Sequence, residues 1–344
     1  MTASKVIAVV GATGGQGGSV VDALLESGEF QVRAVLRNPI PEKADPLRAR
    51  GVEVVQGNLE DKESLITAFK ACARPKPRTP IVRNADIVQG AYAIFAVTDF
   101  IEPFMKFGPD EAKKQELAQA KNLAEAAAAT TSLSHYVWST LPSTSTLSHG
   151  KYPTPHFESK AMADEYIRKE LPGLAAKTTF LWITYYASNL TFPLFTPNLL
   201  KSSGQYGWVQ PVEGSTPITV VGDQRKNVGI FVNAILQKPD LTRGGQYVLA
   251  EVETLTNQQL LERWGKVTGK PVTYIPTSVD AYNALFPKWG LEMGVMLESW
   301  NAAGDQSWSK PGVTPLRKED LGIDAAQLTG LDSALRQIDW SVLL

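Results

Sequence analysis

Short hydrophobic runs alternate with amphipathic stretches over the first half of the chain. The runs are rich in β-branched residues, as buried strands are, and cover residues 5–10, 31–36, 52–56, 92–97, 135–139 and 178–183. Between them, apolar residues recur at three- and four-residue spacing, which predicts helices over residues 15–27, 59–71, 109–131 and 155–170. This order predicts an α/β fold: a doubly wound, parallel Rossmann sheet with helices on both faces.

The alternation weakens after residue 183. Prolines and aromatic residues cluster over 185–208, and the later pattern predicts a strand over 246–250, a helix over 257–268 and a strand over 271–275. We therefore expect a Rossmann domain over residues 1–184. Residues 185–344 are expected to form mainly a smaller C-terminal α/β lobe that covers the substrate, with later segments free to return to the first domain.

Composition narrows the classes of function. The net charge of −1 does not favour nucleic-acid binding, and the one cysteine, Cys72, excludes an internal disulfide framework. Three histidines and one cysteine make no convincing zinc site, so no metal is expected. No apolar stretch has the length of a membrane helix, and glycines follow the first hydrophobic run at once, unlike in a signal peptide. We expect a cytoplasmic protein.

Two further stretches are given ordinary structural roles. Residues 72–84 carry three prolines and several basic residues, which is typical of a solvated loop, here at the sheet edge opposite the ligand crevice. The i,i+4 pairs Asp164–Arg168 and Glu165–Lys169 are interpreted as exposed salt bridges that support a helix.

The strongest motif is the glycine loop Gly11-Ala-Thr13-Gly14-Gly15-Gln16-Gly17-Gly18, which joins the first strand to the first helix. Gly11 suits a sharp turn, Gly14 suits a close approach of the backbone to a diphosphate, and Gly17 suits tight packing of the helix on the sheet. The amides at the start of the helix would then hold the phosphates. This context predicts a dinucleotide-binding loop formed by Gly11, Thr13, Gly14, Gly15, Gln16 and Gly17.

The end of the second strand favours NADP(H) over NAD(H). NAD-binding proteins place a carboxylate there for the ribose 2′-hydroxyl, whereas this strand ends in Arg37-Asn38. Arg37 is suited to pair with a 2′-phosphate. Asn58 and Leu59 after the third strand are expected near the adenine. Ala96, Val97 and Thr98, after the fourth, are expected under the nicotinamide ribose.

Several of these segments together resemble the NmrA-like family of atypical short-chain dehydrogenase/reductases. They are residues 11–17, Val-Arg-Ala-Val-Leu-Arg at 32–37, Gly-Asn-Leu at 57–59, Phe-Ala-Val-Thr at 95–98, His-Phe-Glu-Ser-Lys at 156–160 and Val-Thr-Gly-Lys-Pro-Val at 267–272. The resemblance implies a Rossmann domain, a preference for NADP(H) and a small C-terminal lobe. It also implies one of two activities, because some members resemble isoflavone reductase-type enzymes and others resemble redox sensors that bind a protein partner.

Orthodox members of that superfamily use Tyr-x-x-x-Lys on one helix face. Here the resemblance puts Lys160 at the lysine position and His156 at the tyrosine position. Three interpretations remain: His156 is the acid, since histidine titrates near neutrality; Lys160 acts alone or through a water; or the helix only binds ribose. His156 in a purely structural role is an equally good interpretation.

Further candidates come from the neighbouring segments. Ser139 and Thr140 end the fifth strand, where the superfamily keeps a hydroxyl that orients substrate, although both are also common turn residues. Tyr152, Tyr185 and Tyr186 are alternative phenol donors, and Asn189 lies in a segment that resembles the family's. Phe100 is expected in an apolar pocket wall, with Phe104, Phe107 and Trp208 as further aromatic candidates.

Two functions follow from these observations. The first is an NADPH-dependent reductase of a small carbonyl, enone or imine substrate. The second is a non-enzymatic NADP(H) sensor that regulates a protein partner. The missing tyrosine favours the sensor, and the aromatic-rich second half favours the enzyme.

Overall fold

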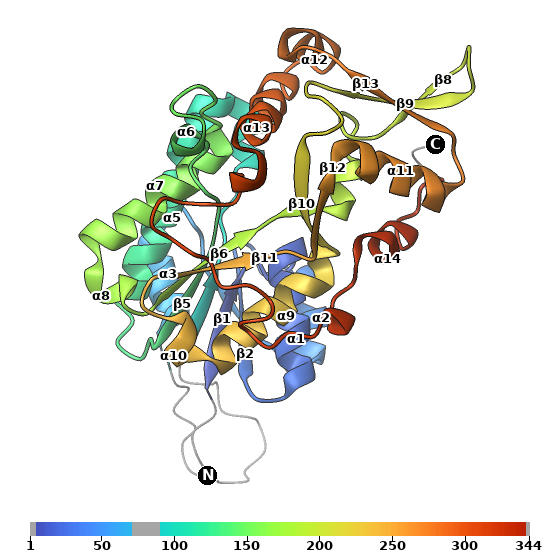
Figure 1. The fold of residues 1–344 in the computed structure, drawn as a ribbon. Coiled ribbons are helices and arrows are strands. Elements are labelled where there is room, and N and C mark those ends of the chain that lie inside the picture. Colours follow the sequence, from blue (N-terminus) through green and yellow to red (C-terminus); the bar gives the residue numbers. More distant parts are fainter. Residues whose placement is uncertain (1–4, 71–89, 342–344) are drawn as a thin grey trace.

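The computed structural model describes residues 5–70 and 90–341 of the chain. Its centre is a seven-stranded sheet in the order β11-β6-β5-β4-β1-β2-β3, in which all neighbouring strands are parallel (Figure 1). The strands are β1 (Val6–Val10), β2 (Gln31–Leu36), β3 (Glu53–Gln56), β4 (Ala93–Ala96), β5 (His135–Thr140), β6 (Thr178–Ile183) and β11 (Gln246–Ala250). The strand order reverses between β1 and β4, which is where such sheets hold ligands. The predicted fold class is confirmed.

Helices cover both faces of this sheet. One face packs against α3 (Lys62–Phe69), α5 (Pro109–Ala128) and α7 (Pro155–Glu170), and the other against α1 (Gly15–Ser27), α2 (Pro41–Ala49) and α9 (Gln224–Gln237). The side chains of β1 point alternately to the two faces of the sheet. Ala8 and Val10 pack in the core with α3, α5 and α7, and Ile7 and Val9 pack in the core with α1, α2 and α9. None of the helices in the described part of the chain combines the length and apolar character that a membrane crossing requires.

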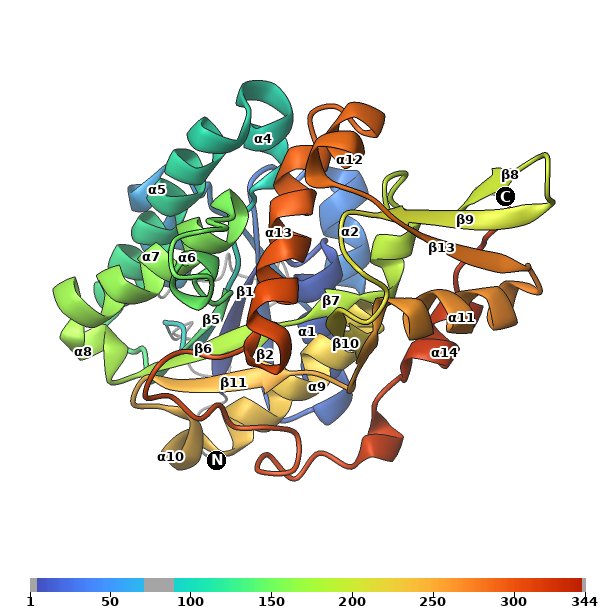
Figure 2. The same ribbon diagram turned by 45° about the horizontal axis from the view of Figure 1, so that its top comes forward.

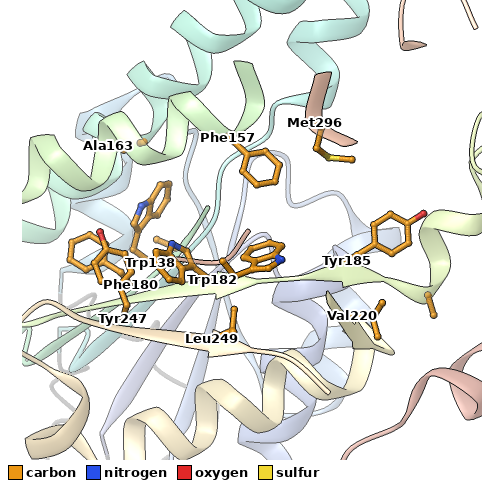
Figure 3. Packing of buried hydrophobic residues seen from close by; sticks show 14 of the residues in the cluster. Trp138, Phe157, Ala163, Phe180, Trp182, Tyr185, Val220, Tyr247, Leu249 and Met296 are labelled. Atoms are coloured by element: carbon orange, nitrogen blue, oxygen red, sulfur yellow. The ribbon is translucent and has the colours of Figure 1, made fainter. Parts of the chain in front are cut away.

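Aromatic side chains dominate the layer between the sheet and α7. Figure 3 shows Trp138, Phe180, Trp182 and Tyr247 gathered beneath this helix. The ring of Tyr247 lies 4.9 Å from that of Phe180 and 4.6 Å from that of Trp182. All four are buried. This packing fixes the position of α7 on β5, β6 and β11.

A second lobe is built around two small sheets (Figure 2). One sheet has the order β12-β10-β7, and the other β13-β9-β8. The strands are β7 (Tyr185–Tyr186), β8 (Asn198–Leu200), β9 (Gln205–Gln210), β10 (Pro217–Gly222), β12 (Glu253–Thr256) and β13 (Val272–Pro276). The helices of this lobe are α11 (Asn257–Thr268), α12 (Val279–Leu285), α13 (Gly290–Ala303) and α14 (Leu331–Arg336). Four further short helices lie along the chain: α4 (Ile101–Phe107), α6 (Thr144–Leu147), α8 (Pro172–Ala175) and α10 (Pro239–Thr242).

The second lobe is not one continuous segment. After β10 the chain returns to the central sheet, where α9 packs on α1 and β11 pairs with β6. The approach of the two helices is close, because Gly229 stands against the Ser19 carbonyl and its amide donates to the Ser19 hydroxyl at 2.8 Å. Helices α2, α4, α9, α12, α13 and α14 are absent from the elements predicted above.

Several predicted boundaries change at helix ends. The helix predicted over 59–71 begins at Lys62, because the Asp61 carboxylate accepts from the amides of Glu63 and Ser64 and caps it there. The helix predicted over 109–131 ends at Ala128. The loop predicted over 72–84, with Cys72, lies outside the described residues.

The interpretation of Asp164 and Arg168 as an exposed pair is wrong. Asp164 is buried, and its carboxylate accepts from the Thr140 hydroxyl at 2.7 Å, the Trp138 indole at 2.9 Å and the Tyr247 hydroxyl at 3.1 Å. Arg168 instead donates to the Gly245 carbonyl. The i,i+4 spacing did not decide the partner, because Asp164 lies on the helix face that meets β5 and β11. The pair Glu165–Lys169 is present, at 3.4 Å.

Burial raises the pKa of the Asp164 carboxyl to about 7, although the hydrogen bond from Thr140 opposes this effect. The pKa of an aspartate in an unfolded chain is about 3.9. Between about pH 4 and pH 7, the Asp164 carboxyl is therefore protonated in the folded chain and ionised in the unfolded chain. The contribution of this group to the free energy of unfolding is therefore fully present at low pH and is lost as the pH rises toward the folded pKa.

Asp164→Asn removes this titration. We expect the free energy of unfolding of the variant, relative to the parent chain, to rise by on the order of 3 kcal/mol between about pH 4 and pH 7. Denaturant unfolding at several pH values measures the difference. Glu165→Gln is the matched control, because Lys310 lowers the pKa of that exposed neighbour and gives a slope of opposite sign. A difference for Asp164→Asn that stays flat across this range would contradict the assignment.

The turn between β1 and α1 depends on two glycines. Gly11 has a φ of 68°, in the left-handed region, and its carbonyl accepts from the Gly14 amide at 2.8 Å. Gly17 packs so closely that a Cβ would overlap the carbonyl group of Gly11 and lie 2.8 Å from the Val10 oxygen. Both contacts are with backbone, which cannot move aside as a side chain can.

Gly17→Ala should therefore destabilise the chain by about 2 kcal/mol through overpacking against the strand. Gly18→Ala is the matched control one residue along, since its Cβ meets the Ala12 oxygen at an ordinary 3.5 Å. The control should be neutral or more stable by about 0.5–1 kcal/mol, as a glycine replaced within a helix usually is. Urea unfolding of both variants checks this, and equal effects would show that the close packing at Gly17 carries no cost.

Candidate functional site

The glycine loop presents free amides at the start of α1. Gly14 is the N-cap residue, no side chain caps this helix, and no acidic residue lies in its first turn. The amides of a first helical turn have no partner within the helix. Together with the helix dipole they make a site suited to an anionic group.

A cleft of about 1370 Å³ runs from this loop past the ends of β2 and β3 to the segment that follows β4. Most of the residues predicted to bind a cofactor line it: Gly11, Thr13, Gly14, Gly15, Gln16, Gly17, Arg37, Asn58, Leu59, Val97 and Thr98. Two lie behind this lining, since Ala96 is fully buried at the end of β4 and Lys160 reaches Thr98 from α7. The cleft joins the glycine loop to the ends of β2, β3 and β4, which is where Rossmann folds hold a dinucleotide.

The far end of the cleft carries Arg37, as predicted, but also a glutamate that the sequence did not suggest. Nη1 of Arg37 lies 2.9 Å from Oε2 of Glu102, and Nζ of Lys106 lies 2.7 Å from Oε1 of the same carboxylate. The hydrogen bond with Glu102 raises the pKa of Arg37, and those from Lys106 and Arg37 lower the pKa of Glu102. Lys43 lines the same end. Glu102 lies on α4, far along the chain from β2.

At the other end, Lys160 is held by a buried carboxylate. Its ammonium lies 2.7 Å from the Thr98 hydroxyl and 2.9 Å from Oε1 of Glu116, which in turn accepts from Thr98 at 2.8 Å. The second Glu116 oxygen accepts from Ser159. The Glu116 side chain is only 1% exposed, and that of Lys160 12%. This network joins α5, α7 and the segment after β4.

Glu116 was missed by the sequence reasoning, although the pattern of α5 contains a signal for it. Ala112, Glu116, Gln119, Ala120 and Leu123 recur at the spacing of the buried face of this helix. A charged residue on such a face requires a partner. Lys160 is that partner.

A second chain of hydrogen bonds crosses the loop itself. The Ser139 hydroxyl donates to Oε1 of Gln16 at 2.8 Å, and Nε2 of Gln16 donates to the Tyr186 hydroxyl at 2.6 Å. Burial raises the pKa of Tyr186, so the phenol stays protonated at neutral pH. Its own hydrogen is not used in the bond from Gln16. Tyr186 therefore brings a protonated phenol to the cleft that it lines.

The other predicted catalytic groups are engaged elsewhere. Thr140 is buried and donates to Asp164, away from the cleft. His156 places Nδ1 2.6 Å from Oε1 of Glu292, and its backbone amide donates to the same oxygen at 3.2 Å. Glu292 belongs to α13, so this pair joins α7 to the second lobe. The ring of His156 also packs against those of Phe100 and Phe157.

The residues predicted for a substrate pocket divide into two groups. Tyr186 and Asn189 line the cleft, and Phe192 beside them completes an apolar edge. Phe100 is buried and stacks on Phe104, 5.5 Å between ring centroids. Tyr185 is buried against Phe195 and Trp300, and Tyr152 is half-buried under Lys151.

The remaining aromatic candidates also separate. Phe107 is exposed at the cleft, whereas Phe104 is fully buried and packs on Trp289 at 4.3 Å. Trp208 is buried in the second lobe, where its indole donates to the Phe195 carbonyl. Of the predicted aromatic and pocket residues, Phe107, Tyr186 and Asn189 thus line the cleft.

A smaller hollow of about 530 Å³ lies between α7 and the segment 309–311. Its floor contains Asp164, Trp182 and Tyr247. Their exposed fractions are 2%, 0% and 1%, so a molecule in this hollow would not reach their polar atoms. The larger cleft, with its open amides and cations, is the candidate site.

Proteins similar in sequence include ones named as oxidoreductases and ones named as nitrogen metabolite repression proteins. An NmrA-like family domain-containing protein of Dictyostelium discoideum is 25% identical over 307 residues, covering 88% of this chain and 89% of its own. The oxidoreductase cpsB of Aspergillus campestris is 27% identical over 303 residues, covering 83% and 80%. The nitrogen metabolite repression protein nmr of Neurospora crassa is 26% identical over 326 residues, covering 90% of this chain and 62% of its own.

Solved structures share the fold. NmrA, described as a negative transcriptional regulator, matches in its complex with NAD (TM-score 0.72) and in its complex with NADP (0.71), each at 22% identity over 97% of this chain and 95% of NmrA. The Citrobacter sp. triphenylmethane reductase complexed with NADP(H) matches with a TM-score of 0.64 at 20% identity, over 96% of this chain and 99% of its own. At these identities the likeness concerns the fold.

Comparison of the sequence with family models identifies the family. The model of the NmrA-like family matches residues 3–311, which is most of the chain and includes the glycine loop, the Arg37 strand end and Lys160. The chain belongs to the NmrA-like family.

Proposed function

We propose that this chain is an NADPH-dependent reductase of a small carbonyl, enone or imine substrate. The observation that carries the proposal is that Tyr186, Arg37 and Thr98 line one cleft, with Lys160 directly behind Thr98. An oxidoreductase among the relatives and an NADP(H)-bound reductase among the structures of the same fold support it.

The residues of the cleft fit the cofactor. The uncapped amides of Gly15 and Gln16 would bind the diphosphate, because Gly11 and Gly14 keep side chains away from that place. Arg37 would bind the 2′-phosphate, with Lys43 and Lys106 nearby. Thr98 and Lys160 would hydrogen-bond the nicotinamide ribose.

The bound dinucleotide would supply the hydride. Tyr186 would give the proton of its hydroxyl to the substrate oxygen or nitrogen, and Ser139 would keep Gln16, and through it the phenol, in place. Lys160 would lower the cost of negative charge that develops beside it. Phe107, Asn189 and Phe192 would bound the substrate on the open side.

One observation favours the alternative of a non-enzymatic NADP(H) sensor with a protein partner. The two basic residues at the positions expected for catalysis, Lys160 and His156, are each already paired with a glutamate. A regulator with this pairing would bind the dinucleotide without moving a proton. The regulators among the relatives and structural neighbours support this second function.

The first experiment measures NADPH binding by fluorescence and then NADPH oxidation with ketones, enones and imines. We expect binding, turnover of at least one class, and a loss of about a hundredfold in kcat for Tyr186→Phe with NADPH affinity largely kept. Phe192→Leu, at the apolar edge, is the control and should change KM more than kcat. Binding without turnover across all three classes would favour the sensor.

A second experiment addresses how Lys160 is held. Glu116→Gln keeps the size of the side chain but leaves a buried ammonium without its counter-charge, which should cost on the order of 3 kcal/mol of unfolding free energy. Dinucleotide affinity should fall as well, because Lys160 and Thr98 lose their common partner. Glu111→Gln on the same helix is the control, since its pair with Lys114 is exposed at 3.6 Å and contributes little. Equal stability of the two variants would contradict a structural role for the Lys160–Glu116 pair.

A further inference from the structure

The end of the cleft that would receive the 2′-phosphate contains more than cations. Glu60, Asp99 and Glu102 line it together with Arg37 and Lys106. Glu102 is the carboxylate that contacts Arg37 directly, and it uses one oxygen for Arg37 and the other for Lys106. Its place is fixed, because the Asp99 carboxylate accepts from the amides of Ile101 and Glu102 and so holds the first turn of α4.

We propose that Glu102 is the residue that limits the preference of this chain for NADP(H) over NAD(H), by occupying the guanidinium that a 2′-phosphate needs. The inference rests on the proposed binding of a nicotinamide dinucleotide in this cleft. It adds a specificity residue on α4 to the one expected at the end of β2.

The chemistry of the two ligands makes the competition unequal. An adenosine ribose with a free 2′-hydroxyl needs no positive charge and leaves the pair of Arg37 and Glu102 intact. A 2′-phosphate needs Arg37 as a charge-assisted donor and also meets the negative charge of Glu102. NADP(H) must therefore displace the carboxylate, and NAD(H) need not.

The exposure of the pair makes this exchange feasible. The side chain of Arg37 is 66% exposed and that of Glu102 38%, so water screens their attraction and the pair is weak. A phosphate with nearly two negative charges competes well for the guanidinium. Glu102 therefore reduces the affinity for NADP(H) without abolishing it. Hydrogen bonds from Lys106 and Arg37 hold the pKa of Glu102 below its usual range, so it carries its charge at neutral pH.

The test is calorimetric titration of the full chain with NADP⁺ and NAD⁺, and with 2′,5′-ADP and 5′-AMP as probes of the adenosine end alone. Glu102→Gln should raise the affinity for NADP⁺ and 2′,5′-ADP by about five- to tenfold, which is the range of an exposed charge pair plus the removed repulsion. The affinities for NAD⁺ and 5′-AMP should stay within about twofold.

Two further variants isolate the cause. Glu60→Gln removes the same charge from the same end of the cleft, where it acts on Arg37 only at a distance, and should change the NADP⁺/NAD⁺ affinity ratio by less than about twofold. In an Arg37→Gln background most of the gain from Glu102→Gln should disappear, because the two residues act through one contact.

The inference is overturned if Glu102→Gln leaves the affinity ratio unchanged, if Glu60→Gln shifts it equally, or if the gain persists in full without Arg37. These results differ from a failure of the proposed function, in which neither dinucleotide binds the parent chain or any variant.

Discussion

The ion pair of Lys160 with Glu116 is the interaction on which the geometry of the site depends. Both side chains are nearly withdrawn from water, so each is tolerable there only because the other supplies the opposite charge. Thr98 and Ser159 satisfy further lone pairs and protons of the pair. A contact that joins α5, α7 and the segment after β4 in this way fixes the wall of the cleft where chemistry is expected.

The same arrangement recurs at the two other basic residues that the sequence motifs single out. Arg37 meets Glu102, and His156 meets Glu292, so each basic group is paired with a glutamate from a different element. The degree of burial separates their roles. An exposed pair such as that of Arg37 exchanges its partner readily, whereas a buried pair does not. The cleft therefore combines a fixed cation at one end with an exchangeable one at the other.

The local parts of this structure could be predicted because they depend on neighbouring residues. The turn from β1 to α1 follows from the spacing of Gly11, Gly14 and Gly17. The bounds of α1, α7 and α11 follow from their periodicity, from a proline at the start of α7, from the capping box of α11 and from the glycines that end α1 and α11. The missed α4, by contrast, is a seven-residue helix with only Pro103 and Phe104 buried, too short to show a period.

Long-range pairings could not be predicted in the same way. No local pattern pairs Glu102, Glu116 or Glu292 with its basic partner, and only the fold brings each pair together. Asp164 shows the reverse error: its spacing to Arg168 permits a surface pair, yet the packing of α7 on β5 and β11 decides otherwise. The spacing of residues along a helix shows which side chains can form a pair, but which pairs form depends on which face of the helix is buried.

The position four residues before Lys160 on α7 holds His156 rather than a tyrosine, which changes where a proton donor can come from. Thr140 gives its hydrogen to Asp164, Ser139 gives its own to Gln16, and Nδ1 of His156 is engaged with Glu292. Tyr186 remains, and it lies on β7, which pairs with β10 of the second lobe rather than with the central sheet. The lysine and the phenol then come from different lobes, so proton transfer would depend on how the lobes sit together. Two hydrogen bonds join the lobes at this place, Gln16 to Tyr186 and His156 to Glu292, and they fix how the lysine and the phenol lie relative to each other.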